Sequence, residues 1–342
     1  MPTAVRTSGK LATLADVARL AGVSVPTASK ALRGQGQLRP ETRQKVAAAA
    51  EQLSFTANPL ARGLLASRSG TVGLVTHDLE GRFSIPILMG AEDAFGLDRL
   101  SVMLSDARGD AIREQRQIEA LVARRVDGII VVGYRSDQRP TLGHRLPVPV
   151  VYAYAHSNDT SDCSIVPNSF LSGRLAVEHL VACGRTQIGV ITGDPTYGAS
   201  QERVRGAATA LKEAGLTMVG GKALFGAWNQ DWGRAAAGAL LDRHPEVDSI
   251  LCGSDQLALG VLDTLWERRI NVPQDISVIG HDNWEVLSAY SRPPLTSVDM
   301  NLEELGRRAA ARLVQAMNGS PAEGMEAIAP HVVLRKSTMP VA

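Results

Sequence analysis

The sequence of 342 residues is poor in aromatic residues and cysteine and contains no long hydrophobic run. Its three cysteines, Cys163, Cys183 and Cys252, are odd in number and show no CxxC spacing. This pattern disfavours a disulfide framework or a metal site, and we expect buried thiols and no cofactor. No apolar run reaches membrane-spanning length, and MPTAVRTSGKLAT at the start lacks the apolar stretch of a signal peptide. We therefore expect a cytoplasmic protein that does not bind membranes.

Sequence motifs of common catalytic sites are absent as well. The chain contains no GxSxG, HExxH or GxGxxG, and GLTMVGGKA departs from a phosphate-binding loop in its glycine spacing. His281, Asp282 and Ser254 contain the residue types of a catalytic triad, but no supporting motif accompanies them. The sequence therefore argues against an enzyme.

The charged residues are unevenly distributed although the net charge is only +1. Residues 1–70 contain ten Lys and Arg against three Asp and Glu, a net charge of +7, whereas the remainder contains 26 basic and 32 acidic residues, a net charge of −6. A basic head on an acidic body is typical of a polyanion-binding module fused to a module with another partner.

Three short helices are predicted in the basic head. Thr13 and Asp16 form a capping box at the start of the first, and Gly22 suits its end. Ser24 caps a second helix, in which Ala28, Ala31 and Leu32 are expected to face inward, and a third runs from residue 40 to about residue 53. Two helices joined by a glycine-containing turn indicate a helix-turn-helix, whose second helix fits the major groove of DNA.

The stretch NPLARGLLASRSG at 58–70 predicts a further helix of about two turns. Asn58 is a good N-cap and Pro59 suits the first helical position, but so short a helix is too weak to form alone in water. Gly63 weakens it further.

From Thr71 onward, short apolar runs alternate with amphipathic segments. This alternation predicts a doubly wound α/β fold, present twice. The predicted helices are 84–95, 110–124, 170–182, 200–214, 230–243 and 255–268. The predicted strands are 71–76, 100–105, 126–133, 149–154, 187–193, 222–226, 249–254 and 276–282. Ligands of open parallel sheets bind beyond the carboxyl ends of the strands, and these ends are rich in acidic and hydrogen-bonding residues.

The segments TLADVARLAGVSVPTASKAL, ETRQKV and NPLARGL resemble, in order and spacing, the lactose-repressor (LacI/GalR) family of bacterial transcription regulators. The resemblance continues through the whole chain. It implies that Val25, Pro26 and Lys30 read bases and that Leu64 enters the minor groove. The other DNA contacts that it implies are Thr13, Leu14, Ser24, Thr27, Ser29, Arg33, Arg39, Thr42 and Asn58.

For the body, the resemblance implies a core like that of periplasmic sugar-binding proteins, with two lobes, three crossing segments and an effector in the cleft. By position, Arg203 and Asp282 would bind the effector, and Trp228 would form an aromatic wall. An arginine fork and a carboxylate that bind vicinal hydroxyls suit a saccharide, although a purine-type corepressor uses similar positions. The implied effector-binding residues are His77, Asp78, Phe83, Arg203, Trp228, Ser254 and Asp282.

These features together predict a transcription regulator, most simply a repressor, that is controlled by a small molecule. We expect a head at 1–57, a hinge at 58–69 and a core at 70–342. The core would form one lobe from about 70–166 and 299–326 and another from about 167–298 and 327–342. We expect a homodimer on a near-palindromic operator in double-stranded DNA, without a tetramerisation tail after LRKSTMPVA. A solute-binding protein or enzyme with the same core is the alternative, and failure to bind double-stranded DNA would favour it.

Overall fold

The computed structural model describes residues 12–32, 36–55, 68–79, 82–98, 100–143 and 146–338. The chain divides into two compact units, residues 1–69 and residues 70–342. Among the described residues, no helix is long and apolar enough to cross a membrane, and no group of side chains is arranged to hold a metal ion. The three cysteines are buried free thiols, as the sequence predicts.

The described part of the first unit contains three helices, α1 (Leu14–Ala21), α2 (Val25–Leu32) and α3 (Pro40–Gln52). The predicted capping box is confirmed, because the Thr13 and Asp16 side chains each accept a hydrogen bond from the other residue's backbone N–H. Gly22 ends α1 with a φ of 66°, a left-handed conformation that glycine adopts readily. The prediction for Leu32 is wrong, since this side chain is 37% exposed. The small core consists of Val17, Ala18, Ala28, Val46 and Ala49.

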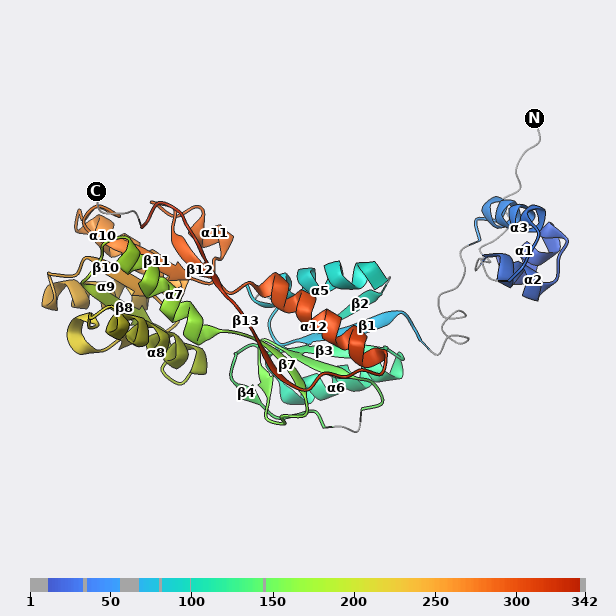
Figure 1. The fold of residues 1–342 in the computed structure, drawn as a ribbon, viewed down its shortest axis with the longest axis horizontal. Coiled ribbons are helices and arrows are strands. Elements are labelled where there is room, and N and C mark those ends of the chain that lie inside the picture. Colours follow the sequence, from blue (N-terminus) through green and yellow to red (C-terminus); the bar gives the residue numbers. More distant parts are fainter. Residues whose placement is uncertain are drawn as a thin grey trace, which may run out of the picture. The chain divides into compact units, whose positions relative to one another are not determined.

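The second unit contains two lobes, each built on a six-stranded sheet (Figure 1). All strand pairs of the first sheet are parallel, in the order β13-β7-β5-β3-β1-β2. The strands are β1 (Thr71–Thr76), β2 (Ser101–Asp106), β3 (Gly128–Val132), β5 (Val150–Ala153), β7 (Cys163–Pro167) and β13 (Gly324–Ile328). A separate parallel pair joins β4 (Gln138–Arg139) to β6 (His156–Ser157).

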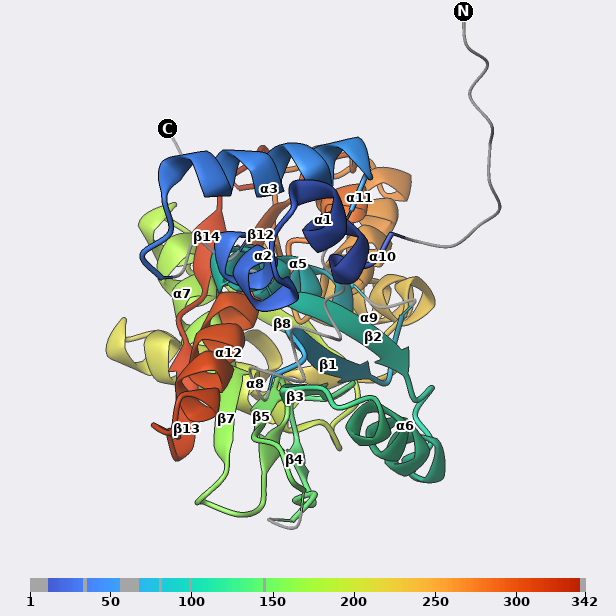
Figure 2. The same cartoon turned by 90° about the vertical axis from the view of Figure 1, so that its right-hand side faces the viewer.

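Helices cover both faces of the first sheet. Figure 1 and Figure 2 show α5 (Ser84–Asp98) and α12 (Leu302–Met317) on one side and α6 (Ala111–Ala123) on the other. Phe95 and Leu305 belong to the core on the first side, and Ile118 and Leu121 belong to the core on the second. The buried strands read as continuous apolar runs because both of their faces are covered.

The second lobe repeats this plan with the strand order β14-β12-β11-β10-β8-β9, in which only the β12–β14 pair is antiparallel. Its strands are β8 (Ile188–Thr192), β9 (Leu224–Phe225), β10 (Ser249–Cys252), β11 (Ser277–His281), β12 (Thr296–Asp299) and β14 (His331–Val333). The cores include residues of α7 and α8 on one face and of α9 and α10 on the other. The helices are α7 (Ser169–Ala182), α8 (Gly198–Glu213), η1 (Val219–Gly221), α9 (Gln230–Arg243), α10 (Asp255–Glu267) and α11 (Glu285–Ser288).

The chain passes between the lobes three times, at residues 167–169, 299–302 and 328–331. The first and third crossings are adjacent, since the Asn168 backbone N–H donates to the Ile328 carbonyl at 3.1 Å. The Asn168 side chain also caps α7. The carboxyl ends of several strands in both sheets therefore face one interlobe region, as the doubly wound pattern predicts.

Candidate functional site

The second helix of the head carries an outward face suited to contact with DNA. Ser24 caps this helix, because its Oγ accepts a hydrogen bond from the Thr27 backbone N–H at 3.3 Å. Val25, Pro26 and Lys30 are exposed, whereas Ala28 on the opposite face is fully buried in the head core. The structure therefore brings together on one surface the three residues that sequence resemblance assigns to base reading.

The other predicted DNA contacts of the head occupy varied environments. Thr13 is exposed and caps α1, whereas Leu14 is half-buried against the head core. Ser29 and Thr42 are half-buried. Arg39 is exposed and precedes α3 without a side-chain cap hydrogen bond, which leaves its guanidinium available at the surface.

Three predicted DNA contacts, Arg33, Asn58 and Leu64, lie outside the described residues, as does Gly63.

A cavity of about 190 Å³ lies between the two lobes of the core. We call it the cleft cavity. Tyr134, Tyr154 and Asp282 reach it from positions just after β3, β5 and β11, which are carboxyl ends of parallel strands. The cleft cavity is lined by Arg82, Phe83, Tyr134, Arg135, Ser136, Tyr154, Tyr197, Ala199, Arg203, Trp228 and Asp282.

Arg203 is the most deeply buried cation of the cleft cavity, with 5% of the residue exposed. It projects from α8, and its Nη1 donates to the Gly253 carbonyl at 2.5 Å. The guanidinium carbon lies 5.8 Å from the centroid of the Trp228 ring, within the range of a cation–π contact. Burial lowers the pKa of Arg203 from its ordinary value, although the nearby charge of Asp282 opposes the shift.

Asp282 forms an ion pair across the two lobes. Its Oδ2 lies 3.2 Å from Nη2 of Arg82, and its Oδ1 lies 2.9 Å from Nδ1 of His281. Burial opposes ionisation of Asp282, but Arg82 and the His281 hydrogen bond outweigh burial and hold the carboxyl pKa below its usual value. Burial and the charge of Arg203 lower the pKa of His281 to about 4, so the neutral ring donates its Nδ1–H to Asp282 at neutral pH.

The backbone is strained at two positions beside the cleft cavity. Asp282 has a φ of 99° and Tyr154 a φ of 71°, conformations that residues other than glycine rarely adopt. The Asp282 backbone N–H donates to the Val298 carbonyl at 2.9 Å, and the Tyr154 N–H donates to the Ile165 carbonyl at 2.9 Å, which holds both residues in place. Such strain persists where the surrounding structure fixes it and is typical of functional sites.

Aromatic rings form two walls of the cleft cavity. Phe83 stacks on Tyr154 with a centroid distance of 4.9 Å, and Tyr197 meets the Trp228 ring edge-on at 5.8 Å. Gly193 makes room for Trp228, because a Cβ at this position would lie 2.1 Å from the ring carbons. The placement of the indole therefore depends on the absence of a side chain at residue 193.

Three residues that the sequence assigned to effector binding do not line the cleft cavity. Ser254 is fully buried, and its Oγ accepts a hydrogen bond from the Leu257 N–H as the N-cap of α10. The His77 ring bonds Glu114 through Nε2 and faces a different cavity of about 600 Å³. Asp78 is half-buried beside it. The structure thus brings together only Phe83, Arg203, Trp228 and Asp282 of the seven predicted residues.

Glu114 explains the position of His77. Both of its oxygens bond Arg139, at 2.6 and 3.0 Å, while one of them also bonds His77. Burial opposes ionisation of Glu114, but these partners outweigh burial and lower its pKa to about 2.

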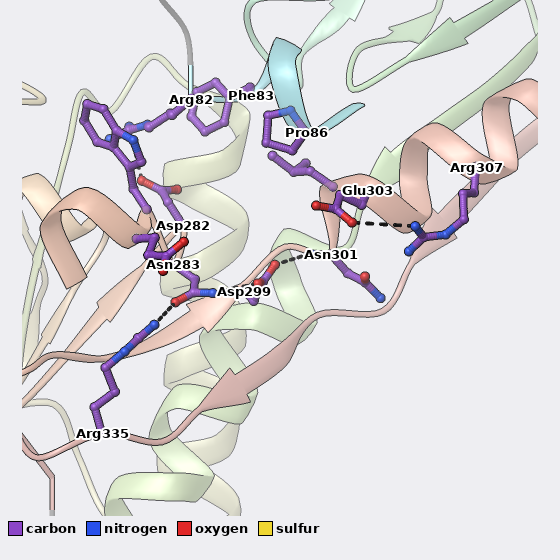
Figure 3. A pocket seen from close by; sticks show the side chains of 13 residues that line it. Arg82, Phe83, Pro86, Asp282, Asn283, Asp299, Asn301, Glu303, Arg307 and Arg335 are labelled. Carbon is purple, nitrogen blue, oxygen red and sulfur yellow. Dashed lines mark hydrogen bonds and ion pairs between the residues drawn. The ribbon is translucent and has the colours of Figure 1, made fainter. Parts of the chain in front are cut away.

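A larger cavity of about 450 Å³ borders the Arg82–Asp282 pair, and Phe83 lines it too. Figure 3 shows that several of its other polar residues bond one another. The Arg335 guanidinium donates to Asn283 Oδ1 at 2.7 Å, and Asp299 accepts hydrogen bonds from Asn283 Nδ2 and the Asn301 backbone. This mutual pairing leaves fewer groups for a ligand than the cleft cavity offers.

Sequence reasoning missed Arg82, Arg135 and Tyr197 in the cleft cavity. Arg82 and Arg135 lie in loops after β1 and β3, and Tyr197 directly precedes α8. Loops after strands carry ligand-binding residues in α/β folds, so the positions themselves were a usable signal.

Comparison with known proteins identifies related families. Residues 13–58 match the bacterial regulatory proteins of the lacI family, and residues 177–338 match the periplasmic binding protein-like domain. The ribose operon repressor of Escherichia coli (strain K12) is 32% identical over 306 residues, which cover 89% of this chain and 92% of that protein.

Solved structures show the same fold. The lac repressor dimer bound to operator and the anti-inducer ONPF superposes with a TM-score of 0.78 at 28% identity, covering 96% of this chain and 100% of that one. A complex of the transcriptional regulator CelR with cellobiose superposes with a TM-score of 0.64 at 28% identity, covering 95% of this chain and 99% of that one.

Proposed function

The chain belongs to the lacI family of bacterial regulatory proteins and is a DNA-binding transcriptional repressor, and we propose that a sugar bound in the cleft cavity controls it. In this proposal the head recognises an operator, and the core senses the sugar. Such a regulator acts where the chromosome lies, in the cytoplasm.

The observation that carries the proposal is a set of buried polar atoms without partners. Nε of Arg203, Nε1 of Trp228 and Oδ2 of Asp282 are buried and make no hydrogen bond to the described residues, and all three residues line the cleft cavity. Arg82 is within ion-pair distance of Asp282 Oδ2 but does not donate a hydrogen bond to it. Buried polar groups are almost always hydrogen-bonded, so a bound ligand is the natural partner for these atoms.

The chemistry of the lining favours a sugar. Two of the partnerless atoms are donors and one is an acceptor, and a hydroxyl group can serve either kind. Aromatic rings such as Trp228 and the Phe83–Tyr154 stack suit the apolar face of a sugar ring. The cellobiose complex of CelR and the ribose operon repressor support this choice by similarity. A nucleobase is the second candidate, because stacked aromatic walls also suit planar rings.

Ligand binding would act through the orientation of the lobes. The cleft cavity contains residues of both lobes, and a ligand that contacts both favours one interlobe arrangement over another. A change between the lobes would then reach the head through the hinge at 58–69, within the proposed division into a head at 1–57 and a core at 70–342.

For the head, we propose that Val25, Pro26 and Lys30 read bases while Thr42 and Arg39 contact phosphates. Val25 and Pro26 have no side-chain donor and would read methyl groups and shape, whereas Lys30 can bond base acceptors. In a homodimer, two such helices about 34–36 Å apart would read a near-palindromic operator.

The proposal can be tested with the full chain. Operator sequences are enriched from random duplex DNA, and binding is then measured with sugars and nucleobases that raise the melting temperature of the protein. We expect a sugar to bind and to change operator affinity, and we expect Asp282→Ala to abolish this response without loss of operator binding. Failure to enrich any DNA sequence, or a cleft ligand without effect on operator affinity, would contradict the proposal.

A further inference from the structure

The three arginines of the cleft cavity differ in how their charges are neutralised. Arg82 pairs with Asp282 at 3.2 Å, and Arg135 pairs with Asp137 at 2.6 Å. Arg203 has no such partner, since no carboxylate oxygen of the described chain lies within 4.0 Å of its guanidinium nitrogens. The cleft cavity therefore contains one positive charge more than its ion pairs account for.

Asp282 stabilises the charge of Arg203 from a distance, but this carboxylate already pairs with Arg82 and makes no ion pair with Arg203. The contacts of Arg203 are the Gly253 carbonyl, the Met300 sulfur at 4.0 Å and the face of Trp228. Its Nε has no hydrogen-bond partner among the residues that the structure describes, and only 5% of the residue is exposed to water. A buried guanidinium without a carboxylate in contact is costly in free energy, because burial removes the stabilisation that water would provide.

We propose that the effector carries an anionic group, a carboxylate or a phosphate, that pairs with Arg203 in the cleft cavity. This inference rests on the proposed function and names the class of its ligand: a sugar acid or a phosphorylated sugar. Arginine binds both anions well because its planar fork forms paired hydrogen bonds with their oxygens.

Asp282 does not oppose an anionic ligand. Arg82 and the His281 hydrogen bond already stabilise its negative charge, while its Oδ2 still lacks a hydrogen-bond donor. A sugar hydroxyl can donate to this oxygen while the anionic group of the same molecule pairs with Arg203. The volume of about 190 Å³ lies below the range of drug-sized pockets, which limits the ligand to about the size of one sugar ring.

The experiment compares matched neutral and anionic sugars by calorimetry and thermal shift on the full chain. The neutral probes are D-glucose and D-ribose. The anionic probes are D-glucuronate, D-gluconate, glucose 6-phosphate, ribose 5-phosphate and, as a minimal anion, inorganic phosphate at tens of millimolar. We expect an anionic sugar to bind at least about tenfold more tightly than its neutral counterpart. Comparison of the sugar acids with the sugar phosphates shows whether the anionic group of the ligand is a carboxylate or a phosphate.

Arg203→Met and Arg205→Met provide the matched variants. Arg205 lies on the same helix, is exposed and pairs with Glu202, so its loss should leave the preference unchanged. Arg203→Met should reduce the preference to about onefold and remove the stabilisation by inorganic phosphate. Three results would overturn the inference. Arg203→Met retains the preference for anionic sugars, the parent binds neutral sugars as tightly as their anionic counterparts, or no anionic probe stabilises the parent.

Operator binding, measured in parallel, tests the proposed function separately from the charge of the ligand. Neutral sugars that bind the cleft cavity and change operator affinity would overturn the anionic ligand and leave the proposed function standing. An anionic ligand that depends on Arg203 but does not change operator affinity would support the inference and contradict the proposed function.

Discussion

The Asp137 carboxylate of the first lobe accepts a hydrogen bond of 2.7 Å from the backbone N–H of Gly198, the first residue of α8 in the second lobe. Arg135 strengthens this contact, since it pairs with Asp137 and lies over the Tyr197 ring with its guanidinium carbon 3.6 Å from the centroid. Its Nη2 also donates to the Thr196 carbonyl at 3.0 Å. A carboxylate at the N-terminus of a helix is further favoured by the helix dipole.

Asp137→Asn should loosen the two lobes and weaken effector binding. The variant removes the charge from the hydrogen bond at Gly198, and a bond of this kind contributes about 1 kcal/mol at a partly exposed site. We expect effector affinity to fall about three- to tenfold in calorimetry. Asp242→Asn is the control, because it removes only a surface pair with Arg268. Equal effector affinities in Asp137→Asn and the parent would show that the interlobe contact does not contribute to effector binding.

The head should show two kinds of contact with operator DNA. Lys30→Ala should weaken binding and relax sequence preference, because a base contact is lost, by about 1–3 kcal/mol at its own operator position. Thr42→Ala should weaken binding to all DNA sequences alike and leave sequence preference unchanged.

The net charge of +7 in residues 1–70 should make the affinity of the parent for operator DNA fall steeply with salt. Titrations at several salt concentrations would check both predictions, and salt-independent affinity would contradict the electrostatic argument.

Much of the fold could be predicted from the sequence because its signals are local. The capping box of Thr13 and Asp16 needs only a spacing of three residues, and buried parallel strands such as β3 read as continuous apolar runs. Strands β7, β12, β13 and β14 were not predicted. In the segment Gly324–Ile328, half-buried and exposed positions alternate before the buried Ile328, and the segment becomes a strand through its pairing with β7. Its placement depends on contacts between residues distant in the sequence.

The cleft cavity was predictable where a residue's type and position sufficed. Arg203 and Asp282 were found by resemblance, but the pair between Arg82 and Asp282 joins positions 200 residues apart and leaves no local pattern. Ser254, also assigned by resemblance, does not line the cleft cavity for a different reason. A serine before a helix is equally suited to capping, and its hydroxyl caps α10.

Asp255 should make the stability of the core depend on pH. Burial and the charge of Asp282 raise its pKa to about 8, so the folded state keeps a proton that the unfolded state loses near pH 4. The contribution is therefore present at low pH and lost as pH rises from about 4 towards 8, with a slope of up to about 1.4 kcal/mol per pH unit. Asp255→Asn, which resembles the protonated side chain, should flatten this slope in urea denaturation. An unchanged slope would contradict the assignment.

Gly193→Ala should displace Trp228 from its place in the cleft cavity. The new Cβ would meet the indole carbons at 2.1 Å, so the ring must move, at a cost of about 1–3 kcal/mol. We expect a lower melting temperature and at least tenfold weaker effector binding. Gly238→Ala is the control, because its Cβ would only approach the end of Arg268 at 3.4 Å and helical alanine is favoured over glycine. Parent-like effector affinity in Gly193→Ala would show that the position of Trp228 does not matter.

Removal of Arg82 and removal of Asp282 should lower the stability of the core by different amounts. Arg82→Met leaves Asp282 with the His281 hydrogen bond and the nearby charge of Arg203. Asp282→Asn removes the carboxylate charge that acts on both Arg82 and Arg203, and of these Arg82 is 16% exposed and can reach water, whereas Arg203 is buried. Loss of one partner of a buried pair costs about 3 kcal/mol when the remaining charge stays buried, so Asp282→Asn should lower core stability the more strongly. The double variant should recover part of that loss, because neither charge then remains unpaired.

Denaturation of the two single variants and the double variant gives the coupling free energy of this pair. Arg308→Met, which removes surface pairs with Glu304 and Glu326, serves as the control and should change stability by less than about 1 kcal/mol. Because the pair joins the two lobes beside the cleft cavity, the coupling free energy should increase when a bound effector holds the lobes together. Equal stabilities of Arg82→Met and Asp282→Asn, with no recovery in the double variant, would show that Asp282 does not depend on Arg82 and that His281 and Arg203 suffice to stabilise its charge.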